Sequence, residues 1–245
     1  TIASTTSTEN SGLYAYLLPK FEEKTGYKTK VIAVGTGQAL DIARRGDADV
    51  AIIHDPEAEN KFIEEGFGVK RILIMYNDFV LIGPKNDPAK ISNEKDILKA
   101  FKKVAESNSL FLSRGDRSGT HTMELRYWKQ LGIDVSIKNS WYKEVGSGMG
   151  ATLNMASALN AYTLSDRSTW SAFKNQGELT ILSEGDPKLF NQYSIILINP
   201  VKYPHINKQG GETLINWITS KDGQKTIANF KVKGQQLFVP NANLN

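Results

Sequence analysis

The chain has 245 residues, of which 40% are hydrophobic and 23% charged, and this fits one large or two small globular domains with a real core. It contains no cysteine, which excludes disulfides, thiolate metal sites and cysteine nucleophiles. No apolar run reaches the length of about 18 residues that a membrane-spanning helix needs. The net charge of +4 leans toward anionic ligands, but the Lys and Arg residues are scattered, so no nucleic-acid-binding stripe is indicated.

The predicted strands and helices alternate along the chain. The first helix covers residues 11–26, where Leu13, Leu17 and Phe21 recur at i, i+4 and i+8 and Gly26 ends the pattern. Extended segments are expected at 28–37, 48–54, 71–84, 109–115, 141–150, 179–185 and 191–199. Further helices are expected at 38–46, 62–66, 94–107, 122–132, 151–161 and 211–230. This alternation predicts an α/β fold with largely parallel sheets.

Two long β segments end in proline and suggest a division into two lobes. They read YNDFVLIGP (76–84) and YSIILINP (193–200), and both have the pattern expected of strands that connect two lobes. The sequence therefore predicts one lobe from residues 1–78 plus 199–245 and a second lobe from residues 79–198.

Glycine- and hydroxyl-rich turns separate several of the predicted strands from the helices that follow them. They cover 5–12 (TTSTENSG), 34–40 (VGTGQAL) and 113–125 (SRGDRSGTHTMEL), with a looser version at 144–154 (EVGSGMGATLN). A helix N-terminus carries unsatisfied N–H groups and about half a positive charge. Several such ends that meet at the carboxyl edge of a sheet form an anion site, in which Ser and Thr donate further hydrogen bonds.

Each of these features also has a plain structural explanation. Ser and Thr before a helix are usually only N-caps. Arg114 and Arg167 lie in turn-like settings and present a donor fork that matches an oxyanion, but a lone Arg is most often a surface or ion-paired residue, and Asp166 is an obvious partner for Arg167. Other motifs are weaker: the chain has no phosphate-binding P-loop, no G-x-S-x-G element, and histidines too far apart in sequence for a metal site.

Taken in order, these segments resemble the tungstate-binding proteins of ABC importers (TupA-like), within the type II periplasmic substrate-binding superfamily. The resemblance covers nearly the whole chain and rests on TTSTENSGL, VGTGQAL, YNDFVLIGP, SRGDRSGTH, GMGATLNMAS, YTLSDRSTW and INP. It implies two α/β lobes with mixed, mostly parallel sheets, joined by two β hinge strands, and a tetrahedral oxyanion held in the cleft between the lobes. The family's first motif commonly reads T-T-T-S, whereas this chain has Ser4 at the first position.

The resemblance also implies which residues bind the anion and what the protein does with it. The ligand-binding residues carried over by motif are Thr6, Ser7, Thr36, Arg114, Ser118, Thr120, Ser147 and Arg167. The anion is bound through its oxygens, with no catalytic residue, no metal cation and no cofactor. The lobes close over it, and a membrane-bound ABC permease then receives it. The expected protein is a monomer that binds no nucleic acid, in the periplasm or anchored outside the cell membrane, and the lack of a Met start fits a processed chain.

Three alternatives remain open at this stage. The same fold could bind molybdate, phosphate or sulfate instead of tungstate, since cavity size and donor placement decide among tetrahedral anions. An enzyme could use Arg114, Ser118 and His121 on a phosphorylated substrate, although no activated nucleophile or carboxylate pair supports it. A sensor domain that feeds a regulator is the third alternative, without any DNA-binding segment to support it.

Overall fold

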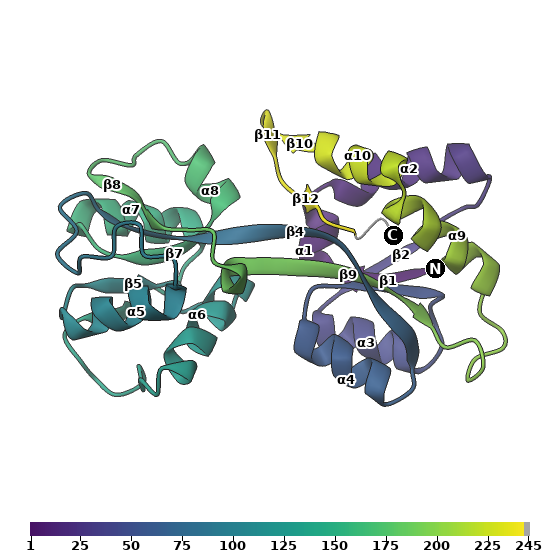
Figure 1. Ribbon diagram of the computed structural model, residues 1–245, viewed down its shortest axis with the longest axis horizontal. Coiled ribbons are helices and arrows are strands. Elements are labelled where there is room, and N and C mark those ends of the chain that lie inside the picture. The colour runs from purple at the N-terminus through teal and green to yellow at the C-terminus, as the bar shows by residue number, and fades with distance from the viewer. Residues whose placement is uncertain (243–245) are drawn as a thin grey trace. The chain divides into compact units, whose positions relative to one another are not determined.

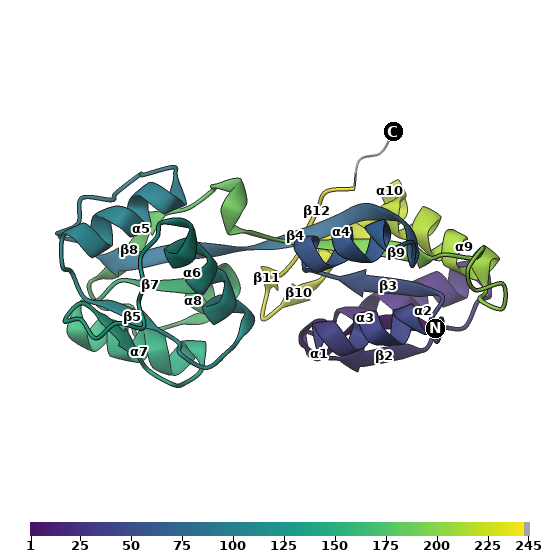
Figure 2. The same cartoon turned by 90° about the horizontal axis from the view of Figure 1, so that it is seen from below.

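The chain folds into two α/β units in a computed structural model that describes residues 1–242 (Figures 1 and 2). The first unit takes Thr1–Asn77 and the segment from Asn191 onward, and the second takes Asp78–Phe190. Residues 243–245, which belong to the first of the lobes expected from sequence, lie outside the described part.

The first unit is built around the strands β1 to β4 and β9. Its elements before the second unit are β1 (Ile2–Thr5), α1 (Thr6–Asn10), α2 (Leu13–Thr25), β2 (Val31–Val34), α3 (Thr36–Arg44), β3 (Val50–Ile53), α4 (Pro56–Glu64) and the start of β4 (Gly68–Pro84). Its elements after it are β9 (Phe190–Ile198), α9 (Lys208–Thr219), α10 (Lys221–Asn229), β10 (Lys231–Val232), β11 (Gln235–Gln236) and β12 (Val239–Pro240). The helix expected at 11–26 begins at Leu13 and is preceded by the separate short helix α1.

The sheet of the first unit has the order β12-β4-β9-β3-β1-β2 and is covered by helices on both faces. The strands β1, β2 and β3 are parallel, and β9 runs antiparallel to β3. Alternate strand residues point to opposite faces, so Ile2 packs with α2, α9 and α10, whereas its neighbour Ala3 packs with α3 and α4. The mixed sheet between two helical layers matches the expected α/β class.

The second unit repeats this three-layer plan. Its elements are the end of β4, α5 (Ile97–Glu106), β5 (Phe111–Ser113), α6 (Gly119–Gln130), β6 (Tyr142–Glu144), α7 (Met149–Leu159), β7 (Thr163–Asp166), α8 (Arg167–Ala172), β8 (Leu179–Ser183) and a 3₁₀ turn, η1 (Pro187–Leu189). The strands β7 and β8 pair antiparallel with β4, and β5 pairs parallel with β6. Leu81 packs on the side of α5 and α6, and its neighbour Val80 on the side of α7 and α8.

The chain passes between the units inside β4, at Asn77–Asp78, and at the start of β9, at Phe190–Asn191. Both passages lie in strands, as expected. The sequence places the boundaries at 78/79 and 198/199 instead. The second boundary differs because β9 pairs with β3 from Ser194 to Leu197, which makes it a strand of the first unit.

Candidate functional site

Three of the predicted binding residues start helices at one edge of the first unit's sheet. The strands β1 and β2 end side by side, with Thr5 opposite Val34. Helix α1 then begins at Thr6 and α3 at Thr36, so the side chains of Thr6, Ser7 and Thr36 belong to the first turns of two neighbouring helices. Thr6 and Ser7 are exposed and Thr36 is half-buried. The structure therefore brings these three residues to the same sheet edge.

Neither of these two helices has a side-chain cap on its first-turn N–H groups, although Gln38 Oε1 accepts from the backbone N of Gly35 at 3.4 Å at the start of α3. The N-cap residue of α1 is Thr5 and that of α3 is Gly35, and no side-chain oxygen accepts a hydrogen bond from the first-turn N–H groups of either helix. No hydroxyl of the run from Ser4 to Thr8 caps the helix expected at 11–26 either, because the short helix α1 begins inside this run and the N-cap residue of α2 is Gly12. Open first-turn N–H groups carry the positive end of the helix dipole, which attracts anions.

The first hydroxyls of the run belong to the strand rather than to the turn. Ser4 is fully buried in β1, where its Oγ lies 2.6 Å from Tyr14 Oη and 2.9 Å from the carbonyl oxygen of Ile52. Thr5 is also buried, and its Oγ1 lies 2.7 Å from Thr8 Oγ1. These bonds fix the strand end from which Thr6 and Ser7 project.

The structure adds His54, which the sequence analysis did not select, to this edge. His54 follows β3, the neighbour of β1, and its Nε2 lies 3.2 Å from Thr5 Oγ1 and 3.4 Å from Ser7 Oγ. Its ring stacks on Tyr193 at a centroid distance of 4.7 Å. Burial lowers the pKa of His54, so the imidazole is neutral at pH 7. The signal available in the sequence was its place directly after a buried strand.

The remaining five predicted residues follow three neighbouring strands of the second unit. The turn after β5 and the turn after β6 are joined by two hydrogen bonds, from Val145 N to Ser113 O at 2.9 Å and from Ser147 N to Arg114 O at 3.1 Å. The chain entering β7 lies beside β5, because Leu112 N donates to Tyr162 O at 2.8 Å. The ends of β5, β6 and β7 are therefore neighbours, and they carry Arg114, Ser118, Thr120, Ser147 and Arg167.

The three hydroxyl residues of the second unit, Ser118, Thr120 and Ser147, differ in their structural roles. Ser118 is the N-cap of α6, and its Oγ accepts from His121 N at 3.2 Å, so the capping interpretation holds here. Thr120 lies in the first turn of α6 and is 6% exposed. Ser147 precedes α7, whose N-cap Gly148 supplies no side chain, so the first turn of α7 is open like those of α1 and α3.

Arg114 forms an ion pair within its own turn. Its Nε and Nη2 donate to Asp116 Oδ2 at 3.1 and 2.6 Å. Burial alone would raise the pKa of Asp116, but hydrogen bonds from Ser118 and Arg114 outweigh it and lower that pKa. Within residues 1–242, Nη1 of Arg114 has no hydrogen-bond partner and remains available as a donor.

Arg167 is paired with two carboxylates, neither of which is the expected Asp166. Its guanidinium binds Asp78 through two nitrogens and Glu184 through the third, at 2.8 Å. These bonds, with Asp78 first, raise the pKa of Arg167. Asp166 instead caps α8, accepting from Thr169 N at 2.8 Å.

Two buried titratable side chains support the turn after β5. His121 Nδ1 accepts from Arg117 N at 3.0 Å, and its buried Nε2 has no hydrogen-bond partner in the described residues, with Glu144 Oε1 3.6 Å away. Glu124 accepts from Tyr142 Oη at 2.7 Å and Trp128 Nε1 at 3.0 Å. Burial raises the pKa of Glu124 to about 7.

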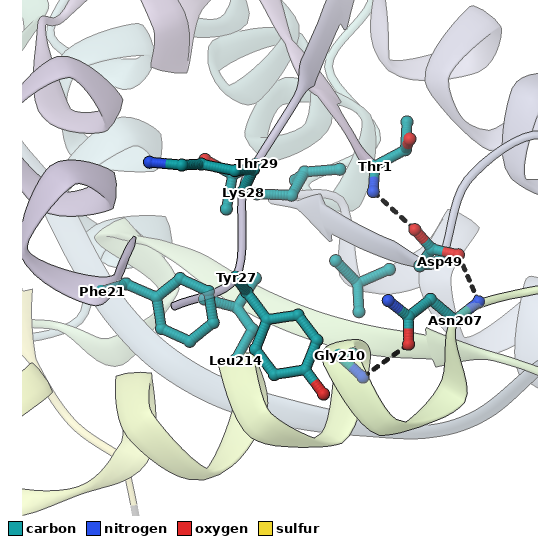
Figure 3. A pocket seen from close by; sticks show the side chains of 12 residues that line it. Thr1, Phe21, Tyr27, Lys28, Thr29, Asp49, Asn207, Gly210 and Leu214 are labelled. Carbon is teal, nitrogen blue, oxygen red and sulfur yellow. Dashed lines mark hydrogen bonds and ion pairs between the residues drawn. The ribbon is translucent and has the colours of Figure 1, made fainter. Parts of the chain in front are cut away.

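Three cavities formed by the described residues are lined by none of the eight predicted residues. One of about 40 Å³ in the first unit is lined by Ile2, Phe21, Tyr27 and Leu214, with Asp49 at its rim (Figure 3). Larger surface hollows of about 390 and 340 Å³ lie beside Trp128 and Ile215. Among the described residues, no three His, Asp or Glu side chains gather as metal ligands would. No helix in that part of the chain combines the length and apolar character needed to cross a bilayer.

Comparison with known proteins defines the class of this two-unit fold. Residues 1–222 match the family described as the PBP superfamily domain, the class of two-lobed periplasmic binding proteins. The chain is 46% identical over 245 residues to the tungstate-binding protein TupA of Peptoclostridium acidaminophilum, covering 98% of this chain and 85% of that protein. It is 39% identical over 240 residues to TupA of Campylobacter jejuni, covering 96% and 88%.

A solved structure of a tungstate-binding protein is also similar to this chain. The tungstate-binding protein TupA from Desulfovibrio alaskensis G20 superposes with a TM-score of 0.89 at 43% identity, covering 99% of this chain and 98% of that one. The chain belongs to the TupA family within the PBP superfamily.

Proposed function

We propose that the protein is an extracytoplasmic solute-binding protein that captures tungstate and delivers it to an ABC permease. The similar proteins carry the name tungstate-binding protein, which supports the choice of ligand. The observation that carries the proposal is the set of hydrogen-bond donors that follow the strand ends in both units. Three helices, α1, α3 and α7, begin there with first-turn N–H groups that no side chain caps, beside hydroxyls in both units and beside Arg114 in the second.

This donor set suits an anion that only accepts hydrogen bonds. Tungstate is fully deprotonated at neutral pH, so each of its four oxygens needs donors and none of them supplies a proton. Backbone N–H groups and the hydroxyls of Thr6, Ser7 and Thr36 provide such donors without adding charge. Donors fixed in place by strands and helix starts need little reorganisation when the anion replaces water.

The arginines contribute less net charge than their number suggests. Arg114 is paired with Asp116, and Arg167 with Asp78 and Glu184. A dianion therefore meets two guanidinium groups that are already partly neutralised. We assign the stronger contact to Arg114, because its Nη1 is free to donate, and we assign most of the remaining binding energy to neutral donors.

We propose that one anion takes donors from both units. The units are joined through strands β4 and β9, and movement about two such connections is the usual form of ligand-driven domain closure. In this proposal the protein acts as a monomer outside the cytoplasmic membrane, makes and breaks no covalent bond, and passes its ligand to the permease in the closed form.

The test is calorimetric titration of anion-stripped protein with tungstate, molybdate, sulfate and phosphate. Tight one-to-one binding of tungstate, far ahead of sulfate and phosphate, is the expected result. Binding in which molybdate, sulfate or phosphate leads would keep the oxyanion class and replace the ligand. The absence of heat with every tetrahedral anion, from a folded sample, would overturn the proposal, and turnover of a phosphate ester would favour the enzyme alternative.

A further inference from the structure

A chain of hydrogen bonds runs from the hydroxyls at the start of α1 to both points where the chain passes between units. It begins at Thr5 and Ser7, whose hydroxyls face His54 Nε2 at 3.2 and 3.4 Å. The other ring nitrogen, Nδ1, lies 3.2 Å from Asn191 Oδ1. Asn191 Nδ2 then donates to Asn77 Oδ1 at 2.9 Å. Asn77 and Asn191 are the residues of the first unit at the two passages.

The bonds of Asn191 determine which ring nitrogen of His54 carries the proton, and this determines the direction of the bonds between His54 and the hydroxyls. Asn191 uses its Nδ2 on two oxygens, Asn77 Oδ1 and Tyr193 Oη at 3.3 Å, so its Oδ1 is the atom that faces His54. An amide oxygen only accepts, so His54 carries its proton on Nδ1. With a neutral ring, Nε2 is then an acceptor, and the hydroxyls of Thr5 and Ser7 are its only donors among the described residues.

The ionisable groups that face His54 do not change the charge of its ring. Tyr193, against which the ring stacks, has its pKa raised to about 12 by burial and is a neutral phenol. Asp55, the next residue, is the nearby acidic group and favours the charged ring, but burial outweighs it and lowers the pKa of His54. The ring therefore stays neutral and keeps its acceptor toward the hydroxyls at pH 7.

We propose that His54 is a positioning residue that couples the anion-binding hydroxyl of Ser7, together with the neighbouring Thr5 hydroxyl, to the Asn77–Asn191 pair at the two passages between the units. This inference rests on the proposed function. Before the anion binds, His54 Nε2 faces both hydroxyls, and it can keep the bond from Thr5 when Ser7 turns its proton to the anion. His54 thus determines how the O–H bonds of Thr5 and Ser7 are oriented, and Asn191 determines the tautomer of His54.

Only a ring with nitrogens on opposite sides can make both bonds. His54→Asn keeps a donor near the Nδ1 position but has no acceptor for the hydroxyls. His54→Gln keeps an acceptor near the Nε2 position but cannot also reach Asn191. Asn191→Ala leaves both hydroxyls and the imidazole in place, and it removes the group that fixes the tautomer together with the bonds to Asn77 and Tyr193.

The experiment is calorimetric titration of these three variants with sodium tungstate, beside two matched controls of the first unit. His205→Gln removes a ring that, among residues 1–242, hydrogen-bonds the carbonyl oxygen of Gly46, and Asn199→Ala removes an amide that bonds Gly66 and Val201. We expect roughly tenfold weaker binding in His54→Asn, His54→Gln and Asn191→Ala, and unchanged binding in the controls. Thermal unfolding of each variant would establish that it is folded.

A second measurement needs no variant, and its first step, the assignment of the tautomer, needs no anion. Nitrogen chemical shifts of the histidine rings in the wild-type protein report the tautomer directly, and we expect His54 to carry its proton on Nδ1 and its Nε2 shift to move when tungstate is added. A proton on Nε2 would overturn the inference, as would wild-type affinity in His54→Gln or Asn191→Ala while the wild-type protein binds tungstate. If the wild-type protein binds no tetrahedral anion, the proposed function fails and the inference fails with it.

Discussion

Arg167 donates two hydrogen bonds to Asp78, from Nε to Oδ1 at 2.9 Å and from Nη2 to Oδ2 at 2.8 Å, and its Nη1 lies 2.8 Å from Glu184 Oε2. The whole guanidinium fork is therefore used within the second unit. Arg114, by contrast, donates to Asp116 through Nε and Nη2 only. The two arginines look equivalent in the sequence, but the structure gives them different capacities for a new acceptor.

This difference predicts unequal effects of the two alanine substitutions. Arg114→Ala should weaken tungstate binding by about 2–5 kcal/mol, because it removes a charge-assisted donor from a desolvated dianion. Arg167→Ala should weaken binding less and lower the melting temperature more, because Asp78, only 16% exposed, loses its partner. Titration calorimetry and thermal unfolding measure the two effects, with Arg45→Ala at an exposed ion pair as the control. Near-wild-type affinity in Arg114→Ala would remove Arg114 from the site.

The hydroxyls divide into binders and caps, and substitutions can separate them. Ser7→Ala and Thr36→Val should each weaken tungstate binding by about 1.5–3 kcal/mol, the size of a hydrogen bond to a charged group, with little loss of stability because neither side chain caps its helix. Ser118→Ala should in addition destabilise the fold by about 1 kcal/mol, since it caps α6. Thr213→Val is the control, because Thr213 is a half-buried residue of α9 whose hydroxyl bonds within its own helix, to the carbonyl oxygen of Gln209. Equal stability losses in Ser7→Ala and Ser118→Ala would contradict this division.

Local sequence patterns predicted most of the architecture, because they depend on neighbours in the chain. Alternating strands and helices gave the α/β class, and the hydroxyl-rich turns do lie at strand ends. Helix α1 was not predicted, because its residues lie in the polar turn expected at 5–12, and no local pattern placed Ser4 and Thr5 in a strand. Their burial in β1 depends on Tyr14 and on Ile52 in another strand, which no local pattern reveals.

Pairings between distant residues could not be predicted from the sequence. Arg167 has an acidic neighbour, Asp166, yet pairs with Asp78, which lies 89 positions away in the sequence. The link between His54 and Asn191 likewise spans 137 positions. Such partners are set by which strands are adjacent, and strand order is a property of the whole fold.

Glu124 predicts a specific pH dependence of stability. Burial raises the pKa of this carboxyl from 4.5 to about 7 in the folded protein. The folded state then binds the proton more tightly than the unfolded state, so the free energy of unfolding should fall by about 3 kcal/mol as the pH rises from about 4.5 to about 7. Glu124→Gln keeps an acceptor for Tyr142 and Trp128 and has no charge, so this fall should disappear.

Urea unfolding at pH 5 and pH 8, followed by tryptophan fluorescence, measures this dependence, and Trp128 lies next to the carboxyl. Glu106→Gln, on the exposed face of α5, is the control and should keep the wild-type pH dependence. The same loss of stability between the two pH values in wild type and Glu124→Gln would show that Glu124 is charged throughout.

Glu59 and Arg71 form a buried ion pair that supports the turn carrying His54. Glu59 is fully buried, pairs with Arg71 and Ser194, and accepts from Asp55 N at 2.9 Å through its other oxygen. Burial raises the pKa of Glu59, and the bonds from Ser194 and Arg71 act against this rise. The carboxylate thus depends on its partners to remain charged inside the unit.

Removing only the cation should therefore cost more than removing the pair. Arg71→Met should destabilise the protein by about 3–5 kcal/mol at pH 8, because it leaves an uncompensated buried carboxylate, and adding Glu59→Gln should recover most of that loss. The deficit of Arg71→Met should shrink as the pH is lowered, because protonation of Glu59 removes the buried charge. Chemical denaturation of both single variants and the double variant measures these energies. A loss below about 1 kcal/mol in Arg71→Met, as for a surface pair, would mean that water reaches Glu59.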